Sequence, residues 1–205
     1  MFKKLALMSA AAAFAVPMAV SAAPISLDGY YVNSTFDPEG AGSDDGDGLG
    51  VRLMVPFQGS GIRIHGEYQT AELDDSNVDL DQLRLGASFM TEGNARFGAV
   101  AEYVNITLDG GGGEFEPDGY GIHGRGEFSM SEQFQFYGQI GYVDTSDSGT
   151  DLSGIEYLIG GVFNITPMWG IGVDYRYSDL ELEDGGEADV SLEDIRIGVR
   201  VNFGT

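Results

Sequence analysis

The two histidines of the chain occur in similar groups of charged residues. The first group is Arg63, His65 and Glu67, and the second lies within 123–127, where His123 is followed by an arginine and a glutamate. A histidine beside a carboxylate is the pair that acid–base and nucleophilic catalysis uses, if a nucleophile and the substrate can reach it. The residues of each group are two positions apart, which places their side chains on one face of a β-strand. The alternative to catalysis is a network of ion pairs.

Apolar residues alternate with polar or small ones through most of the sequence after residue 22. Strands that face lipid on one side and a polar lumen on the other have this period of two. No later apolar stretch approaches the roughly 20 residues that a membrane-spanning helix needs, so a closed antiparallel β-barrel is the structure left that satisfies its backbone in a bilayer. The clearest strand segments are 51–57, 62–65, 83–89, 134–142, 169–177 and 195–203.

Short turns alternate with longer, acidic, glycine-rich connections. The turns are predicted at 58–61, 92–95, 131–133 and 166–168, and the longer connections at 37–48, 73–80, 109–118, 144–151 and 179–191. Four turns and five connections join ten strands; an eight-stranded barrel without one hairpin, the first being the candidate, is the alternative. Short periplasmic turns and long outer loops are the usual asymmetry of bacterial outer-membrane barrels.

Aromatic residues mark both ends of the predicted strands. A soluble sandwich would scatter them through a core, whereas two belts indicate two membrane interfaces. Next to the short turns are Phe57, Phe89, Phe97, Phe128, Phe134, Phe163, Trp169 and Phe203, and nearer the long connections are Tyr68, Tyr103, Tyr120, Tyr142, Tyr175 and Tyr177.

The N-terminal residues have the order of a secretory signal peptide. Lys3 and Lys4 precede an apolar run, Leu5–Val20, and the small residues Ser21 and Ala22 follow it. That order is the one a signal peptidase processes. We expect residues 1–22 to be the signal peptide and residues 23–205 to form one barrel domain.

The charges of residues 23–205, which remain once the predicted signal peptide is removed, are unevenly distributed along the chain. Without Lys3 and Lys4, eight arginines oppose 33 acidic residues, a formal charge of −25. Seven arginines fall at inward strand positions, and only Arg96 is assigned to a turn. Side chains can fill the lumen of a small barrel, and a guanidinium group can bond two carboxylates at once. We therefore predict a structural ion-pair plug, with a selectivity lining as the alternative. The predicted network is Arg52, Arg63, Glu67, Arg84, Glu102, Arg125, Glu127, Glu156, Asp174, Arg176, Arg196 and Arg200, and Asp194 is a further inward acid.

Both histidines fall inside this predicted network, at mid-strand positions that point into the lumen. A lipid hydrolase needs its serine, histidine and acid where lipid can reach them, and a protease of the omptin type needs its histidine at the loop end. We therefore expect no enzymatic function and no resident cofactor.

The predicted loops carry the excess of acid. Such loops repel nucleic acid and anionic surfaces unless cations bridge them. Residues 44–48, Asp-Asp-Gly-Asp-Gly, supply the oxygen ligands that calcium or magnesium prefers, but without the downstream glutamate of an EF-hand. Solvated loops are the expectation, and loop-bound Ca²⁺ or Mg²⁺ is the alternative.

The chain resembles the small outer-membrane β-barrel proteins of the OmpA/OmpX type, most closely at its C-terminus. Arg196, Gly198, Val201 and Phe203 fit the spacing of the β-signal that the barrel-assembly machinery reads, although Gly204 and Thr205 follow the aromatic residue. The resemblance implies contact with outer-membrane lipid and lipopolysaccharide, and a role in envelope integrity, adhesion or small-solute passage. We expect a plugged, monomeric barrel that makes surface contacts through its acidic loops; a small channel is the alternative.

Overall fold

The computed structural model describes residues 24–40, 42–111, 113–182 and 188–204. The predicted signal peptide lies outside these ranges. Within them, no helix is long and apolar enough to cross a membrane. The described residues form eleven strands: β1 (Ile25–Pro38), β2 (Asp44–Pro56), β3 (Ile62–Leu73), β4 (Asp79–Met90), β5 (Ala95–Gly110), β6 (Gly113–Phe115), β7 (Asp118–Ser129), β8 (Phe134–Asp147), β9 (Thr150–Asn164), β10 (Trp169–Leu182) and β11 (Ala188–Phe203).

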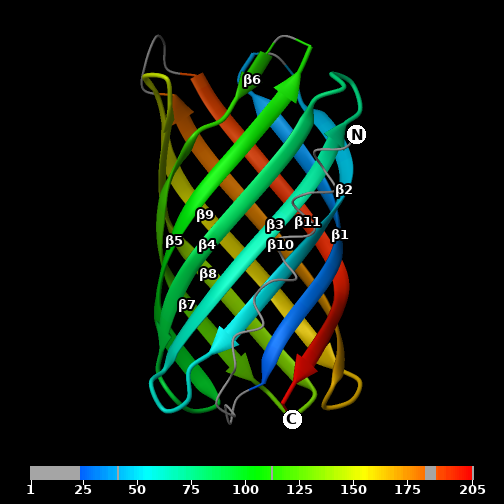
Figure 1. The fold of residues 1–205 in the computed structure, drawn as a ribbon, viewed down its shortest axis with the longest axis vertical. Helices are drawn as coiled ribbons and strands as arrows, with labels where there is room; N and C mark the ends of the chain where they lie inside the picture. The colour runs from blue at the N-terminus through cyan, green and yellow to red at the C-terminus, as the bar shows by residue number, and fades with distance from the viewer. Residues whose placement is uncertain (1–23, 41, 112, 183–187, 205) are drawn as a thin grey trace.

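Ten of these strands close into one antiparallel barrel (Figure 1). Their order around the ring is β4-β3-β2-β1-β11-β10-β9-β8-β7-β5, and the pairing of β4 with β5 completes it. The seam between β1 and β11 is fully paired, from Ile25 opposite Phe203 to Pro38 opposite Val190. β6 pairs only with the end of β5 and does not join the ring. The ten-stranded prediction is confirmed and the eight-stranded alternative is wrong.

The connections lie at two different ends of the barrel, here named the turn end and the loop end. The turn end holds the four short turns together with the start of β1 and the end of β11. The four turns fall where the sequence predicts them. The loop end holds the described parts of the β1–β2, β3–β4, β5–β7 and β8–β9 connections, including β6 (Figure 1).

The strands extend further toward the loop end than the sequence analysis predicts. Residues 44–48, 144–147, 150–151, 179–182 and 188–191, assigned there to loops, lie in strands. Residues 183–187, the middle of the last predicted loop, lie outside the described ranges. The acidic composition suggested loops, but acids that alternate with apolar residues form a strand equally well when the acids face water.

A belt of apolar side chains surrounds the half of the barrel nearer the turn end. Ile171 and Val173 on β10 and Ile195, Ile197 and Val199 on β11 all point outward and are about half exposed. Phenylalanines and Trp169 edge this belt at the turn end, and tyrosines edge it on the other side, as the sequence predicts. Such a belt is the lipid-facing surface of a membrane barrel.

Candidate functional site

Glu67 lies at the centre of the ion-pair network in the lumen. Its carboxylate on β3 accepts hydrogen bonds from Arg52 on β2, Arg176 on β10 and Arg196 on β11. The bonds from Arg176 and Arg196 are 2.7 Å and 2.8 Å long and reach the same oxygen, Oε1. Because β3 and β10 are not neighbours in the ring, this carboxylate ties distant parts of the wall together across the lumen.

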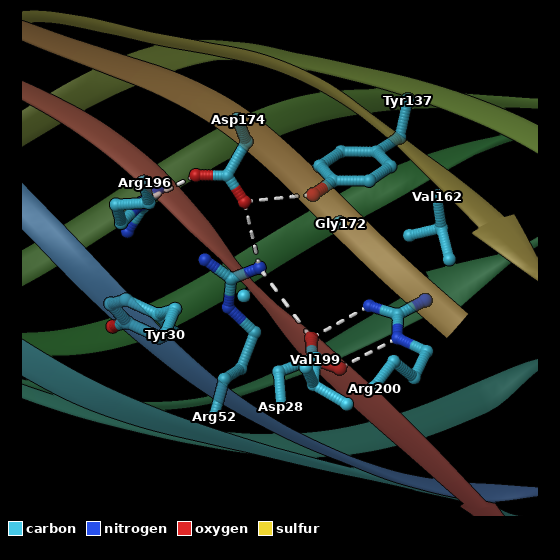
Figure 2. A pocket seen from close by; sticks show the side chains of 11 residues that line it. Asp28, Tyr30, Arg52, Tyr137, Val162, Gly172, Asp174, Arg196, Val199 and Arg200 are labelled. Atoms are coloured by element: carbon cyan, nitrogen blue, oxygen red, sulfur yellow. Dashed lines mark hydrogen bonds and ion pairs between the residues drawn. The ribbon is translucent and has the colours of Figure 1, made fainter. Parts of the chain in front are cut away.

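Asp174 on β10 is a second centre of the network (Figure 2). It accepts a hydrogen bond from Arg196 on the neighbouring strand β11. It also accepts bonds from Nη1 of Arg52 at 3.1 Å and from the hydroxyl of Tyr137 at 2.8 Å. Arg52 and Arg196 therefore each bridge Glu67 and Asp174, so the two acids and two arginines form one closed cluster.

Glycines make room for the tyrosines that cross the lumen. A Cβ atom added at Gly50 would lie 2.3 Å from the ring of Tyr30, and one at Gly160 would lie 2.7 Å from the ring of Tyr137. The guanidinium group of Arg125 lies 4.8 Å from the centroid of the Tyr137 ring, within cation–π distance. Large side chains thus fill the space that small inward residues leave.

Arg84 on β4 pairs with glutamates on two other strands. Its Nη1 donates to Glu102 at 2.9 Å and to Glu156 at 3.0 Å, and its Nη2 donates to the second oxygen of Glu156. Arg84 and Glu156 are each 1% exposed. The hydroxyl of Ser178 adds a bond to Glu156 at 2.8 Å. Arg84, Glu102 and Glu156 are all buried and charged, and each has an opposite charge in contact.

Both histidines belong to this part of the network. Nε2 of His65 lies 2.9 Å from Glu102, and Nε2 of His123 lies 3.3 Å from Glu156. Glu102, His123 and Glu156 are a group whose ligand atoms lie within 4.8 Å of one another, close enough to hold a metal ion. Arg84, however, donates to both glutamates, so its guanidinium group occupies the place of a cation. We interpret the group as part of the ion-pair network.

A third cluster, the turn-end cluster, consists of Glu127 and three arginines. Arg63 donates to both carboxylate oxygens at 2.8 Å and 2.9 Å, Arg96 lies 2.7 Å from Oε2, and Nε of Arg125 donates at 2.9 Å. The side chain of Glu127 is 2% exposed, whereas those of the three arginines are 12–27% exposed. The acid is thus covered by the guanidinium groups.

The structure places each of the twelve residues of the predicted network in at least one ion pair and adds two that the sequence analysis missed. Arg96, assigned to a turn, is the second residue of β5 and points inward to Glu127. Asp28 on β1 accepts two bonds from Arg200 at 2.6 Å and 2.7 Å. The parity of β5 identifies Arg96, since it shares its face with Glu102. The sequence analysis did not assign which face of the first strand points inward, so it did not identify Asp28.

Asp194 is inward, as predicted, but its partners are neutral. Ser34 donates to one oxygen at 2.7 Å, and the amides of Gln69 and Gln82 donate to the other at 2.9 Å and 3.2 Å. These residues form a polar layer. On their strands the next inward residues toward the loop end are apolar, namely Phe36, Ala71, Leu80 and Leu192.

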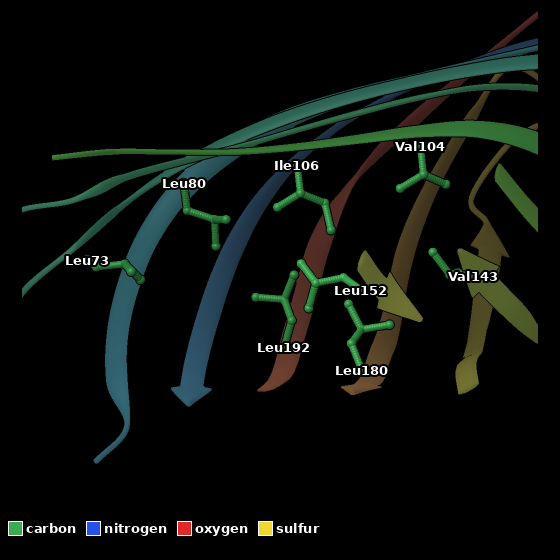
Figure 3. Packing of buried hydrophobic residues seen from close by; sticks show 8 residues of the cluster. All are labelled: Leu73, Leu80, Val104, Ile106, Val143, Leu152, Leu180 and Leu192. Carbon is green, nitrogen blue, oxygen red and sulfur yellow. The ribbon is translucent and has the colours of Figure 1, made fainter. Parts of the chain in front are cut away.

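Beyond that layer the lumen is filled by an apolar cluster, here named the apolar plug (Figure 3). Side chains from several strands around the ring meet in it, and each is at most 6% exposed. The residues are Leu73, Leu80, Val104, Ile106, Val143, Leu152, Leu180 and Leu192. The outward neighbours of these residues are polar or acidic, among them Asp144, Asp151, Asp179 and Glu181. In this half of the barrel the polarity is inverted: the inside is apolar and the outside is acidic.

Leu73 of the apolar plug also lines a depression at the loop end. The depression measures about 750 Å³ and lies between the β1–β2 and β3–β4 connections and the β5–β6 hairpin. Apolar side chains and two acids, Asp44 and Asp75, line it. This volume and mixture are typical of small-molecule sites. The apolar residues are Phe36, Pro38, Leu73, Val78, Leu108 and Phe115.

Asp44, the first residue of β2, is bonded to the β3–β4 connection that lines the depression. Its carboxylate accepts bonds from the backbone N–H groups of Asp75 and Ser76, both at 2.9 Å. The side chain of Ser76, and then these two N–H groups, hold the pKa of the Asp44 carboxyl below its ordinary value. The acid is therefore charged at neutral pH and fixes the β3–β4 connection against β2.

The predicted cation motif at 44–48 has a different shape from a cation-binding loop. It is a strand, so Asp44 points inward while Asp45 and Asp47 point outward. Asp45 accepts a bond from Thr35 at 2.7 Å, and Asp47 accepts one from the side chain of Asn33 at 3.0 Å. The three carboxylates do not converge, and loop-bound Ca²⁺ or Mg²⁺ stays the alternative to solvated loops.

The residues of the predicted assembly signal lie on both faces of β11. Arg196 and Gly198 point into the lumen, and Val201 and Phe203 point outward. The strand forms the seam with β1. Its reading by an assembly machinery stays a prediction from the sequence.

Comparison with known proteins agrees with this architecture. Residues 5–203 match the family model described as the outer membrane protein beta-barrel domain. No curated protein sequence matches the chain. Three solved barrels are similar in fold: the neisserial surface protein NspA (14% identity, 87% of this chain and 97% of that one, TM-score 0.51), the outer membrane protease OmpT from Escherichia coli (11%, 88% and 97%, 0.58), and an outer membrane channel from Pseudomonas putida F1 (11%, 90% and 97%, 0.53). At these identities the likeness concerns the fold alone.

Proposed function

The chain belongs to the family of the outer membrane protein β-barrel domain, and from that premise we propose that it is a non-conducting barrel that acts at the cell surface. It is an outer-membrane protein that crosses the bilayer with ten strands. The more specific role is argued from how the lumen is closed and from the charge and apolar surface at the loop end.

Two successive barriers of opposite character support a non-conducting lumen. The ion-pair network fills the half surrounded by the apolar belt, and the apolar plug fills the half beyond it. An ion would have to displace buried salt bridges and then leave water altogether among leucines, and both steps are costly. The observation that carries the proposal is that a charged barrier fills one half of the lumen and an apolar barrier fills the other.

The voids within the network are small. Two of them measure about 20 Å³ and 40 Å³. Each has room for one or a few water molecules. Such water would satisfy buried N–H groups that have no hydrogen-bond partner among the described residues, for example Nε of Arg84 and Nε of Arg176. Voids of this size support a packed lumen rather than an aqueous pore.

The outward surface beyond the belt supports a surface role. Every arginine lies in the lumen, and the only lysines are Lys3 and Lys4, so the loop end carries acids without basic residues. Neutral or cationic groups are favoured there and anionic ones are repelled. The depression at the loop end adds an apolar surface with an acidic rim, which suits an apolar body with a positive charge.

Current through a planar bilayer tests the proposal. The folded barrel, verified by its heat-modifiable migration on a gel, is expected to insert without a steady unitary conductance. A steady current in the wild-type protein that changes in Arg125→Gln or Glu102→Gln would contradict it and favour the small channel. Outward Asp151→Gln is the matched control, since it removes a charge from the outer surface and not from the lumen.

A further inference from the structure

The turn-end cluster has more positive charge than its single buried acid can balance. Arg63, Arg96 and Arg125 surround Glu127, whose two oxygens accept hydrogen bonds from Arg63 and Arg125 and form a salt bridge with Arg96. A carboxylate offers about four acceptor positions, and the contacts with the three arginines already use four. The remaining N–H groups of the guanidiniums have no further acceptor in Glu127. Nε of Arg96 is buried and has no hydrogen-bond partner among the described residues.

Neighbouring acids are committed to other arginines. Asp28 is bonded by Arg200, and Glu102 is bonded by Arg84 and lies against His65. The turn-end cluster therefore keeps a surplus of two positive charges. Desolvated like charges repel strongly, so the cluster is stabilised by any anion that reaches it.

The surplus charge faces an open depression at the turn end. Its volume is about 280 Å³, and Arg63 and Arg96 line it together with the β2–β3 and β4–β5 turns. Glu92, at the rim, is the one acid in the lining. The three arginine side chains are 12–27% exposed whereas Glu127 is 2% exposed, so the positive groups lie between the acid and the solvent.

We propose that this depression is a binding site for a phosphate-class oxyanion, held by Arg63 and Arg96 with Arg125 behind them. Guanidinium groups present paired N–H donors that match the oxygens of a phosphate. The anion neutralises the surplus and supplies the acceptors that Glu127 lacks. The phosphate group is that of a lipid headgroup or of the free ion. This site lies at the opposite end from the acidic surface, so it stands or falls independently of the proposed function.

Nitrogen-15 NMR of the arginine side chains in a maltoside detergent tests the site. The eight arginines are the only source of Nε–Hε signals. Inorganic phosphate, titrated at constant ionic strength, is expected to shift the Arg96 signal saturably and to leave that of Arg84 in place. A charge-assisted hydrogen bond is worth about tenfold or more in affinity, so Arg96→Gln should weaken binding, followed at Arg63, at least about tenfold. Arg96→Lys should weaken it less.

Two matched variants separate a built site from general attraction to positive charge. Glu92→Gln removes the rim acid and should tighten binding, whereas Glu132→Gln removes an acid from a different turn and should leave binding unchanged. A shift that never saturates, that appears equally on all eight arginines, or that survives Arg96→Gln would overturn the proposal.

A second arm identifies the source of the phosphate. Nanodiscs of phosphatidylcholine with and without phosphatidylglycerol, free of inorganic phosphate, replace the detergent. A shift of the Arg96 signal from its position in phosphate-free maltoside that the Arg84 signal does not share, in either kind of nanodisc, assigns the site to a headgroup. A shift with inorganic phosphate alone assigns it to the free ion. The absence of a shift in both arms rejects the site.

Discussion

Arg84 on β4 and Glu156 on β9 form a two-point salt bridge across the lumen, 72 residues apart in the sequence. The two strands are far from adjacent in the ring. The bridge is thus made by the closed barrel and by no single hairpin.

Removal of Arg84 should strongly destabilise the barrel. Arg84→Met leaves Glu156 and Glu102 buried without their main partner, and breaking a buried pair from one side costs about 3–5 kcal/mol. Adding Glu156→Gln should recover part of that loss, because one of the stranded charges is removed. Urea unfolding in lipid vesicles measures both variants. Equal stability of Arg84→Met and the wild type would mean that the network contributes nothing.

Truncation of the apolar plug should cost as much as truncation of a soluble core. Leu180→Ala removes a buried side chain from the plug, and such changes cost about 2–5 kcal/mol. The next residue, Glu181, points outward, and Glu181→Ala is expected to change the free energy of unfolding by less than about 0.5 kcal/mol. A similar effect of both substitutions would show that the loop end is not packed.

The boundary of the membrane should lie between Val173 and Glu181 on β10. The chain has no cysteine, so single-cysteine variants carry one label site each. On intact cells, a maleimide that cannot cross membranes should label Glu181→Cys and leave Val173→Cys unlabelled. Labelling of Val173→Cys would show that this position lies outside the membrane. If Glu181→Cys is labelled on lysed cells but not on intact cells, the loop end faces the periplasm, opposite to the predicted orientation.

The depression at the loop end should prefer an apolar amine over the corresponding acid. 4-Phenylbutylamine and 4-phenylbutyrate share one apolar body and differ in charge, and the acids of the rim favour the amine. Amide shifts of residues around Val78 follow the titration, and Val78→Trp should block it by filling the depression. Leu182→Trp, whose residue does not line the depression, is the control. Equal affinity for the two probes would show that the acids at the depression do not select for positive charge.

Acid should loosen the link between β2 and the β3–β4 connection. The Asp44 pKa is lower in the folded protein than its ordinary value. The link is therefore fully present above the ordinary pKa, about 3.9, and is lost as the pH falls through the lowered value. The amide shifts of Asp75 and Ser76 should titrate with Asp44 over that range. Asp44→Asn abolishes this titration if the assignment is correct; an unchanged titration in the variant would point to another acid.

Local alternation determined much of this fold before any tertiary structure was considered. The period of two along Trp169–Tyr177 and Ile195–Phe203 identifies strands and their lipid-facing side, because side-chain direction in a strand depends only on position parity. The same parity places Arg63, Glu67 and Arg125 in the lumen. Turn composition and spacing provide the strand count.

Only the closed barrel decided which inward charges meet and where the lumen changes character. Glu67 contacts Arg176, and Arg84 contacts Glu156, because the register of all ten strands sets the height of each inward residue along the barrel axis. Segments such as Asp179–Leu182 looked like acidic loops, since nothing local shows that Leu180 finds apolar partners on other strands. Burial and pairing are collective properties of the ring, and so they lie beyond the reach of a local pattern.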